Sequence, residues 1–376
     1  MMALHWLGMM LAALALVGCG YQLFAAISLK RFFGRARAPA GFAEAVTILK
    51  PLHGDEPMLC ANLATCIAQD YGAAVQMLCG VSDPQDPAAG VVRQLRADNP
   101  ELTIDLIVDA IKHGANAKIG SLINMLPFAR HDLLVLSDSD MAVDRDYLAT
   151  IVAALTQPGI GAVTCLYRGR ADAGIWSVVA AGTISYVALP DIMVGIITGL
   201  ARPCMGSTIA LRRETLVAIG GFDRFADVLA DDYAIGQAVG ETGRRVTIPP
   251  LLLVHACADE GAGAVWRHHL RWAATIRSLH PAGYAGSIVS NPLPLAILAS
   301  VLLGLPGLAL VILSLVARFI LVRRVDRIAG IASAPLWLLP AIDCLKFAVF
   351  VASFFVTKVD WRGARYTMAA NGGITA

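Results

Sequence analysis

Two aspartates, Asp138 and Asp140, follow an apolar run at residues 132–136 and are separated by a single residue. In an extended strand, positions i and i+2 share a face, so both carboxylates can converge on one hard divalent cation where the strand ends. Mg²⁺ or Mn²⁺ held in this way can bridge a diphosphate and neutralise it as a leaving group. The spacing therefore predicts a metal-assisted site for a phosphorylated substrate.

A second acidic pair, Asp231 and Asp232, stands at the start of a predicted helix in LADDYAIGQAVGETG. Asp231 suits an N-cap, where a carboxylate accepts hydrogen bonds from the first backbone N–H groups and meets the positive end of the helix dipole. Asp232 suits a general base, because a carboxylate close to a bound cation can take the proton from an attacking hydroxyl. We expect Asp232 to be the catalytic residue, with Asp231 beside it.

Two other polar residues have both a structural and a functional interpretation. Asp83 follows the apolar run 75–81 and precedes a proline, which is typical of a turn, but its place after a strand also suits contact with a nucleotide. Lys118, in HGANAKIGSL, is either a solvated lysine at a helix start or a cation for a phosphate or base. We predict that both residues contact the donor.

The segment at 264–280, AVWRHHLRWAATIRSLH, predicts an amphipathic helix rich in tryptophan and arginine. Such a helix is typical of a belt lying along the membrane surface. The same helix can use Arg271 and Trp272 to close over a diphosphate and an acceptor. Both interpretations hold together if the acceptor is a lipid that is met at the interface.

The elements that must position these residues alternate along the middle of the chain. Strands are predicted at 46–49, 75–81, 103–108, 132–136 and 160–165, and helices at 58–69, 87–97, 118–126 and 145–155. Apolar strands alternating with helices predict an α/β fold with a mainly parallel sheet covered on both faces. Ligands of such sheets bind at the carboxyl ends of the strands, where the aspartates stand.

The composition indicates that part of the chain lies in lipid. Of the 376 residues, 57% are hydrophobic and 15% charged, against about 25% charged in a typical soluble domain. This excludes a disordered chain and an ordinary soluble enzyme. The net charge of +2 excludes a strong electrostatic attraction to nucleic acid.

The apolar residues concentrate at the two ends. Residues 7–29 carry no charge and are followed by four basic residues, Lys30, Arg31, Arg35 and Arg37. By the positive-inside rule, the N-terminus lies outside and the following domain lies in the cytoplasm. Residues 292–322 form a second apolar run, which GLPG at 304–307 interrupts. This run is either one tilted span or two half-inserted helices.

A third terminal run, at 334–357, carries Asp343 and Lys346, whose i and i+3 spacing allows them to pair on one helix face. The stretch 175–200 is also long enough to span a membrane, but a crossing there would separate Asp138 from Asp232. We therefore expect it to be a core helix or a wall that dips into the membrane surface.

These patterns predict six segments. They are a membrane anchor at 1–30, a basic juxtamembrane linker at 31–44, a cytoplasmic α/β domain at 45–262, an interfacial region at 263–290, membrane segments at 291–357 and a cytoplasmic tail at 358–376. The basic residues Arg323, Arg324 and Arg327 conflict with this topology, because a single crossing at 292–322 would place them outside.

The motifs resemble the family 2 and 21 inverting glycosyltransferases, and among them the ceramide glucosyltransferase type. The resemblance covers residues 46–365 and rests on TILKPLHGDEP, GVSDPQDP, HGANAKIGSLINMLPFARHDLLVLSDSD, ADDY, HHLRW and WRGARY. HGAN, LINMLP, TCLYRGR, TIALRRETL and HHLRWAATIR look most similar to the bacterial glycosyltransferases of hopanoid biosynthesis. The resemblance implies a GT-A-like domain with membrane helices at both ends, in the bacterial inner membrane.

The resemblance also implies a role for each motif. Asp83 would bind the uridine of a UDP-sugar donor, Asp138 and Asp140 the diphosphate and its Mg²⁺ or Mn²⁺, and Asp232 would be the base. Arg271 and Trp272 would complete the site. The implied reaction transfers N-acetylglucosamine from its UDP donor to the hydroxyl of a membrane lipid, bacteriohopanetetrol.

Two departures from the ceramide type stand out. His268 occupies the first position of the motif that ends in Arg271 and Trp272, where the ceramide enzymes have Gln or Arg, and DSD supplies a second carboxylate that they lack. Alternatives are a ceramide glucosyltransferase using UDP-glucose, a processive polysaccharide synthase and a non-catalytic membrane scaffold. The sequence gives no indication of oligomeric state.

Overall fold

The computed structural model describes residues 1–38, 43–356, 358–361, 364–368 and 374–375, with side chains as far as Val356. The chain forms two compact units. The described parts of Arg35–Tyr167 and Arg202–Ala258 make up the sheet unit, and Met1–Gly34, Arg168–Ala201 and the described residues from Asp259 to 368 make up the helical unit. The predicted linker 31–44 and tail 358–376 lie partly outside the described residues.

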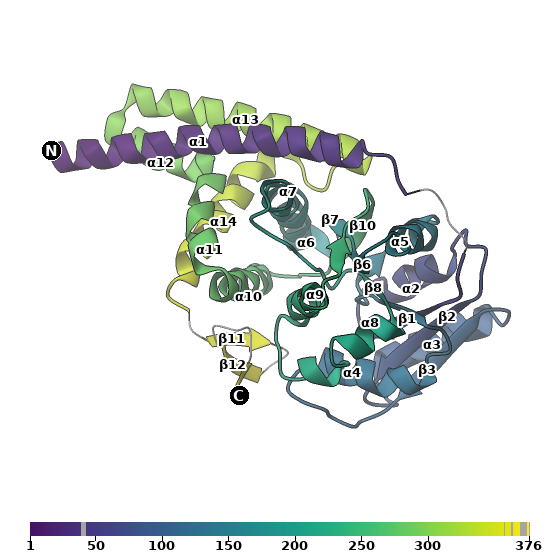
Figure 1. Ribbon diagram of the computed structural model, residues 1–376. Helices are drawn as coiled ribbons and strands as arrows, with labels where there is room; N and C mark the ends of the chain where they lie inside the picture. The colour runs from purple at the N-terminus through teal and green to yellow at the C-terminus, as the bar shows by residue number, and fades with distance from the viewer. Residues whose placement is uncertain (39–42, 357, 362–363, 369–373, 376) are drawn as a thin grey trace. The chain divides into compact units, whose positions relative to one another are not determined.

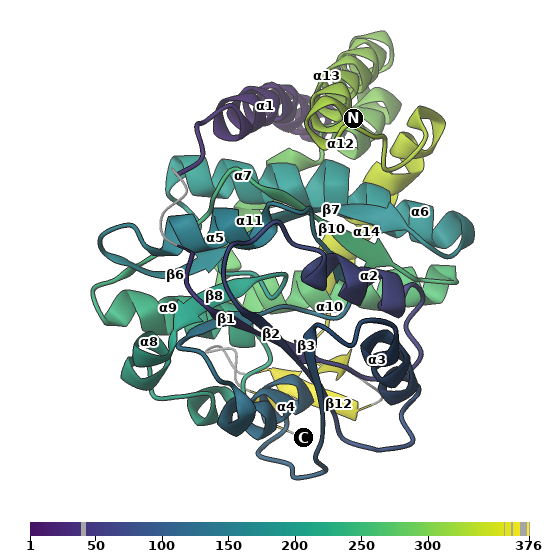
Figure 2. The same ribbon diagram turned by 90° about the vertical axis from the view of Figure 1, so that its right-hand side faces the viewer.

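The sheet unit is built on a seven-stranded sheet with the order β3-β2-β1-β4-β8-β6-β9. Its strands are β1 (Val46–Pro51), β2 (Val75–Val81), β3 (Thr103–Val108), β4 (Leu133–Leu136), β6 (Ile160–Thr164), β8 (Ile209–Arg212) and β9 (Arg245–Thr247). The first four are parallel to one another, and β1, β2 and β3 lie side by side (Figure 2). Only β8 runs against the strands beside it. The mainly parallel α/β fold is thus confirmed.

Helices cover both faces of this sheet, because neighbouring residues of each strand enter different cores. Ile48 of β1 packs in one core and Leu49 in the other, as the two-residue period of a strand requires. The first core lies under α2 (Leu59–Ile67), α3 (Pro87–Asp98) and α5 (Tyr147–Leu155). The second lies under α4 (Ala117–Met125), α8 (Arg213–Ala218) and α9 (Asp231–Glu241). A small antiparallel pair joins β5 (Met141–Ala142) to β10 (Leu252–Cys257).

The helical unit contains the apolar termini. Its helices are α1 (Met2–Phe33), α6 (Gly174–Thr183), the π-helix η2 (Ile184–Ala188), α7 (Leu189–Thr198), α10 (Ala262–Leu279), α11 (Pro281–Gly286), η4 (Ser287–Ser290), α12 (Pro292–Leu303), α13 (Leu305–Ala329) and α14 (Leu339–Ser353). Strand β7 (Leu166–Ala171) precedes α6, and β11 (Lys358–Trp361), β12 (Ala364–Met368) and β13 (Ile374–Thr375) follow α14.

Helices α12 and α13 form a hairpin against α1, rather than one tilted span (Figure 1). Gly304, between them, has a φ of 68°, which favours glycine. Gly8 of α1 lies against Leu303, the last residue before the turn at Gly304, and Cys19 Sγ lies 3.4 Å from Ser314 Oγ on α13. Because α13 starts at this turn beside the beginning of α1 and meets Cys19 further along, α13 runs parallel to α1 (Figure 1).

This direction removes the conflict over the basic residues. Lys30 and Arg31 end α1, and Arg323, Arg324 and Arg327 lie near the end of α13. Since the two helices are parallel and in contact, both basic clusters lie at the same end of the pair.

Four helices in the described part of the chain are long and apolar enough to cross a membrane: α1, the α6–α7 stretch Gly174–Thr198, α13 and Leu336–Ser353. The pair Pro281–Ser290 and Pro292–Leu303, bent by 66°, makes a fifth if it is one span. The stretch Gly174–Thr198 lies between two segments of the same sheet. A single crossing there would pull that sheet apart, which agrees with its interpretation as a core helix or membrane-dipping wall.

The predicted boundary 45–262 differs from the observed units, because Arg168–Ala201 belongs to the helical unit. The reason is a set of polar contacts within that unit. Tyr186 Oη donates to Asp326 at 2.6 Å, and Arg318 donates to the Tyr186 carbonyl and to Asp343. These bonds tie the α6–α7 stretch to α13 and α14.

The pairing of Asp343 with Lys346 that their spacing allows is not the one observed. Asp343 instead pairs with Arg318 on α13, while Lys346 Nζ lies 2.8 Å from Asp191 Oδ2 on α7. Each charge pairs with an opposite charge on another helix, which meets the need of a buried ion for a partner.

We expect Arg318→Met to destabilise the helical unit strongly, because it leaves the Asp343 carboxylate buried without its guanidinium partner. Breaking a buried pair costs about 3–5 kcal/mol. The double variant Arg318→Met, Asp343→Leu should regain more than half of the loss, since no uncompensated charge remains. Thermal unfolding of the full chain in detergent measures both; equal losses in the single and double variants would contradict the assignment.

Candidate functional site

The carboxylate of Asp138, which follows β4, meets the start of α4. Lys118 Nζ lies 2.6 Å from Asp138 Oδ1 and 3.5 Å from Asp231 Oδ2 at the start of α9. Burial lowers the pKa of Lys118, but Asp138, Asp231 and Asp232 together outweigh it and raise the pKa above its usual value. Lys118 is therefore a charged ammonium between two acidic elements, and not a solvated lysine.

Asp231 is held by Asn116 rather than acting as a helix cap. It is the first residue of α9 and 6% exposed, and it makes no capping hydrogen bond. Asn116 Nδ2 donates to Asp231 Oδ1 at 3.2 Å and to the Val228 carbonyl at 2.8 Å. The predicted N-cap role of Asp231 is wrong, because its carboxylate turns toward Asn116 and Lys118. Asn116 itself caps α4 by accepting from the Ile119 N–H.

Asp232 is oriented by backbone amides. Its Oδ2 accepts from Gly206 N at 2.9 Å, and its Oδ1 accepts from Tyr233 N at 2.7 Å. Burial and the neighbouring Asp231 raise the pKa of Asp232 to about 6, although Lys118 and the two amides oppose the shift. A carboxyl group with this pKa is mainly ionised at neutral pH and is a stronger base than an ordinary aspartate.

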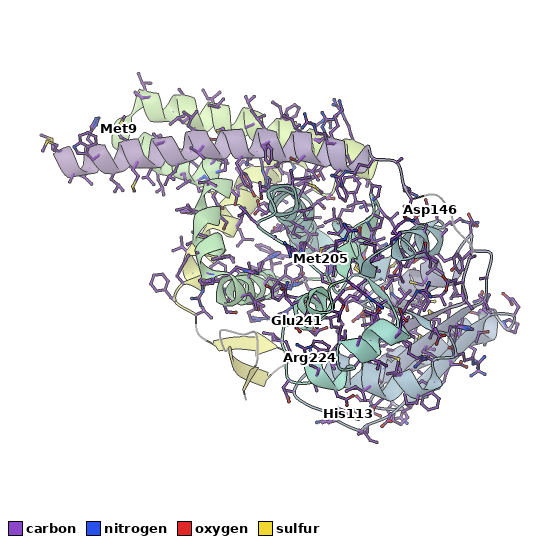
Figure 3. All side chains as sticks on the ribbon, viewed as in Figure 1. Met9, His113, Asp146, Met205, Arg224 and Glu241 are labelled. Carbon is purple, nitrogen blue, oxygen red and sulfur yellow. The ribbon has the colours of Figure 1, made fainter. Side chains whose placement is uncertain are left out.

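Gly206 brings the acidic residues together, and the motifs gave no indication of it. Besides donating to Asp232, it accepts from Asp138 N at 3.3 Å. A Cβ at this position would lie 2.7 Å from Asp138 Oδ2 and 2.8 Å from Lys118 Nζ. Its chain neighbour Met205, labelled in Figure 3, is buried. Only a residue without a side chain allows this approach.

His255 on β10 is a second residue that the motifs did not reveal. Its Nε2 lies 3.2 Å from Asp140 Oδ2, and its ring stacks on Tyr167 with centroids 5.5 Å apart. Burial lowers the pKa of His255, but Asp140 outweighs this and the net shift is upward. A histidine in the apolar strand LLVHAC is the one sequence signal that could have found it.

The side chains that follow β4 offer ligand atoms that fit a divalent cation. Asp138 and Asp140 offer carboxylate oxygens, and each of them already faces a basic side chain, Lys118 beside Asp138 and His255 beside Asp140. Among the described residues, no three acidic, histidine or cysteine side chains form a ready-made metal cluster. A cation of the Mg²⁺ type takes one or two carboxylates from the protein and further oxygens from substrate phosphates, and the two aspartates match that requirement.

The loop that bears Asp138 rests on a buried lysine. Lys50 at the end of β1 is fully buried and donates to Ser137 Oγ at 3.0 Å and to the Asp138 carbonyl at 2.8 Å. Ser139, the middle residue of DSD, donates to Glu56 Oε1 at 2.8 Å. Both bonds fix the loop from the side of β1.

Asp83 lies in the same unit but is exposed, and it forms the turn that Asp-Pro indicated. Its Oδ1 accepts from Gln85 N at 2.8 Å. The following Asp86 accepts from the Gly54 and Ala88 N–H groups. These bonds connect the loop after β1 to the start of α3. The binding role of Asp83 stays a prediction.

The remaining candidates lie on α10, in the helical unit. The ring of His268 meets that of Trp272 edge-on with centroids 4.5 Å apart, and His268 Nδ1 lies 3.6 Å from Asp259 Oδ2. His268 thus orients Trp272 one turn further along the helix. The structure brings Lys118, Asp138 and Asp231 into contact. Asp232 lies beside them and is hydrogen-bonded to Gly206. Arg271 and Trp272 belong to the helical unit.

A mostly parallel sheet covered on both faces, with acidic residues gathered after β4 and at the start of α9, is a GT-A-like glycosyltransferase fold. A solved structure agrees: the mannosyltransferase from Pyrobaculum calidifontis, in complex with GDP-Man and Mn²⁺, is similar over 94% of this chain and 99% of that one. The TM-score is 0.56 and the sequence identity 21%. The sequence profile of Glycosyl transferase family 21 matches residues 10–374, and the chain belongs to this family.

Two curated relatives are similar to a smaller part of the chain. The chain is 22% identical to ceramide glucosyltransferase 1 of Caenorhabditis elegans over 208 residues, which are 54% of this chain and 43% of that one. It is 27% identical to the ceramide glucosyltransferase of Candida albicans over 123 residues, 30% of this chain and 23% of that one. The chain thus spans less than half the length of these two relatives.

We expect Gly206→Ala to lower the free energy of unfolding by about 1–3 kcal/mol, because its methyl group would push Asp138 and Lys118 apart. Gly240→Ala is the matched control, since a Cβ there meets open space on helix α9. That change should stabilise the protein by about 0.5 kcal/mol. Denaturant unfolding measures both, and equal effects would refute the close packing at Gly206.

Proposed function

We propose that this protein is a membrane-bound inverting glycosyltransferase that moves a sugar from a UDP donor to a lipid hydroxyl. One observation carries the proposal. Asp232, with a pKa of about 6, accepts a hydrogen bond from Gly206, and Asp138 and Lys118 lie next to the same glycine. A base beside a phosphate-neutralising cluster is what a displacement at the sugar carbon requires. Membership of family 21 supports the same reaction class.

In this proposal Asp138 and Asp140 would hold Mg²⁺ or Mn²⁺, with His255 positioning the Asp140 carboxylate. When bound, the cation neutralises the diphosphate as it leaves. Lys118 and Arg271 add positive charge for the same phosphates, and Asp83 contacts the uridine. Trp272, oriented by His268, packs against the acceptor.

Asp232 takes the proton of the attacking lipid hydroxyl. Hydrogen bonds from two backbone N–H groups fix both carboxylate oxygens, so the base is already oriented before the acceptor arrives. A single displacement inverts the configuration at the sugar carbon and gives a β-linked product from an α-linked donor.

We expect the rate to follow the ionisation of Asp232. Below about pH 6, kcat/KM should fall roughly tenfold per pH unit, and Asp232→Asn should lower turnover about 100-fold to 10,000-fold while UDP-sugar still binds. Asp231→Asn is the informative partner variant, because Asp231 raises the pKa of Asp232 and its removal should shift the acid limb to lower pH. An unmoved limb in Asp231→Asn, or near-normal turnover in Asp232→Asn, would contradict this role.

Unfolding does not produce the same pH profile. The raised pKa means that Asp232 binds its proton more tightly in the folded state than in the unfolded chain. Asp232 therefore adds stability as the pH falls from about 6 toward 3.8, the ordinary pKa of an aspartate. A thermal unfolding scan at each pH therefore separates loss of the base from loss of the fold.

The acceptor is proposed to be a hopanoid polyol, bacteriohopanetetrol, with UDP-N-acetylglucosamine as donor. Support comes from the motifs HGAN and LINMLP and from the apolar α6–α7 stretch, which would let a rigid ring system stay in lipid. The second candidate is glucosylation of ceramide from UDP-glucose, which the two ceramide glucosyltransferase relatives favour.

Competition between bacteriohopanetetrol and ceramide in one reaction, with both UDP-sugars present, separates these candidates. We expect a product with the mass of N-acetylglucosaminyl bacteriohopanetetrol. Exclusive glucosylation of ceramide would replace the first candidate with the second. The Asp232→Asn protein serves as the control for sugar transfer by contaminants.

The proposed topology has three crossings of a bacterial inner membrane: α1, the bent α11–α12 pair and α13. This places the sheet unit and both basic clusters in the cytoplasm, as the positive-inside rule favours. The end of α14 supports a cytoplasmic tail, because Ser353 donates to Tyr284 on α11 at 3.0 Å and Arg277 on α10 donates to the Val356 carbonyl. Helix α10 and the start of α11 follow the sheet unit in the chain before the proposed crossing, so they lie on its side of the membrane in this proposal.

Cysteine labelling in intact cells tests this topology. A cysteine replacing Gly304, in the turn between α12 and α13, should react with an impermeant maleimide. A cysteine replacing Gly330, just after α13, should stay unlabelled until the cells are opened. The reverse pattern, or labelling of both, would overturn the proposed orientation.

A further inference from the structure

We propose that Lys118 is an exchangeable counter-ion: it occupies Asp138 before the donor binds and withdraws toward Asp231 and the diphosphate when a divalent cation and UDP arrive. The inference rests on the proposed function and deepens it. It gives Lys118 a role in the order of binding, beyond adding positive charge for a phosphate.

The geometry offers Lys118 two partners within reach. Its Nζ lies 2.6 Å from Asp138 Oδ1 and 3.5 Å from Asp231 Oδ2. The second carboxylate is held in place by Asn116, so it is already positioned to take the ammonium. A lysine on a flexible four-carbon stem can shift between these oxygens without a change of backbone.

Asp138 cannot serve Lys118 and a divalent cation in the same way at once. Its Oδ2 lies so close to the backbone of Gly206 that a methyl group there would approach to 2.7 Å. Its Oδ1 is held by Lys118, and an ammonium beside a divalent cation on one oxygen is strongly repelled. A cation that reaches Asp138 therefore competes with Lys118.

The exposed fractions of the Lys118 and Asp138 side chains indicate which of the two an incoming cation reaches first. The Asp138 side chain is 35% exposed, while that of Lys118 is 16% exposed. The carboxylate is thus the accessible member, and the lysine lies behind it toward Asp231. Removal of the lysine should leave Asp138 free for a cation without any nucleotide.

Linkage follows from the exchange. UDP brings new phosphate oxygens that can take the ammonium of Lys118, so nucleotide binding should strengthen cation binding, and the reverse must hold by the same factor. Without UDP, the wild-type protein should bind the cation weakly, because Lys118 occupies the carboxylate.

The experiment measures Mn²⁺ binding to the full chain in detergent, from the EPR signal of free Mn²⁺, with and without UDP. Lys118→Met should bind Mn²⁺ without nucleotide about 10-fold to 100-fold more tightly than wild type, the range expected for loss of a competing charged hydrogen bond. Lys118→Arg keeps the cation and should stay near wild type. Lys112→Met, at an exposed lysine nearby in the chain, is the matched control and should not change Mn²⁺ binding.

UDP provides the second readout. It should strengthen Mn²⁺ binding to wild type by about tenfold or more, and much less in Lys118→Met, where no lysine has to be moved. Unchanged or weaker Mn²⁺ binding in a folded Lys118→Met protein would overturn the exchange. If that variant does not fold, wild-type Mn²⁺ affinity that is independent of UDP overturns it equally. If neither protein binds Mn²⁺ even with UDP, the metal-assisted function fails as well.

Discussion

Compensation of negative charge is the constraint on which the sheet unit depends. Four aspartates from two distant parts of the chain gather where β4 ends and α9 begins. The positive partners are Lys118, between two of them, and His255, beside a third. Asp232 is stabilised by backbone amides and has the raised pKa that a base needs. The same charge balance that permits folding therefore sets the chemistry.

The helical unit follows the same rule in an apolar setting. Arg318 pairs with Asp343 and also donates to the carbonyl of Tyr186, which lies in the π-helix η2. A π-helix shifts the pattern of backbone bonding, so a carbonyl can be used by a side chain from elsewhere. The irregular turn and the buried arginine thus explain each other, and together they fix the α6–α7 stretch to α13.

The alternation of apolar and polar residues was enough to predict the elements of the sheet unit, because the periods of strands and helices depend on residues that are close in sequence. Asp138, Asp231 and Asp232 could be singled out for the same reason, since each stands at the end or start of an element, and their roles stay predictions. Local pattern gives no indication of Gly206, and of His255 only that a histidine stands in an apolar strand. Their roles arise from contacts across about 70 and 115 residues of chain, Gly206 with Asp138 and His255 with Asp140. The pairing of Asp343 depends on packing likewise: the spacing allowed a partner at i and i+3, but packing supplied Arg318 from another helix.

The insertion of Arg168–Ala201 within the sheet unit has a consequence for biosynthesis. During translation, the apolar α6–α7 stretch leaves the ribosome before β8, the strand that joins β4 to β6. Its partner Asp326 is 140 residues further along the chain than Tyr186, a delay of roughly 10 s at common elongation rates. For that interval α13 and α14 are missing, and α1 is the helix already made that contacts the stretch, since Tyr21 on α1 donates to Asp191 on α7. Part of the apolar stretch therefore stays uncovered until the C-terminal helices follow, which ties completion of the helical unit to the end of synthesis.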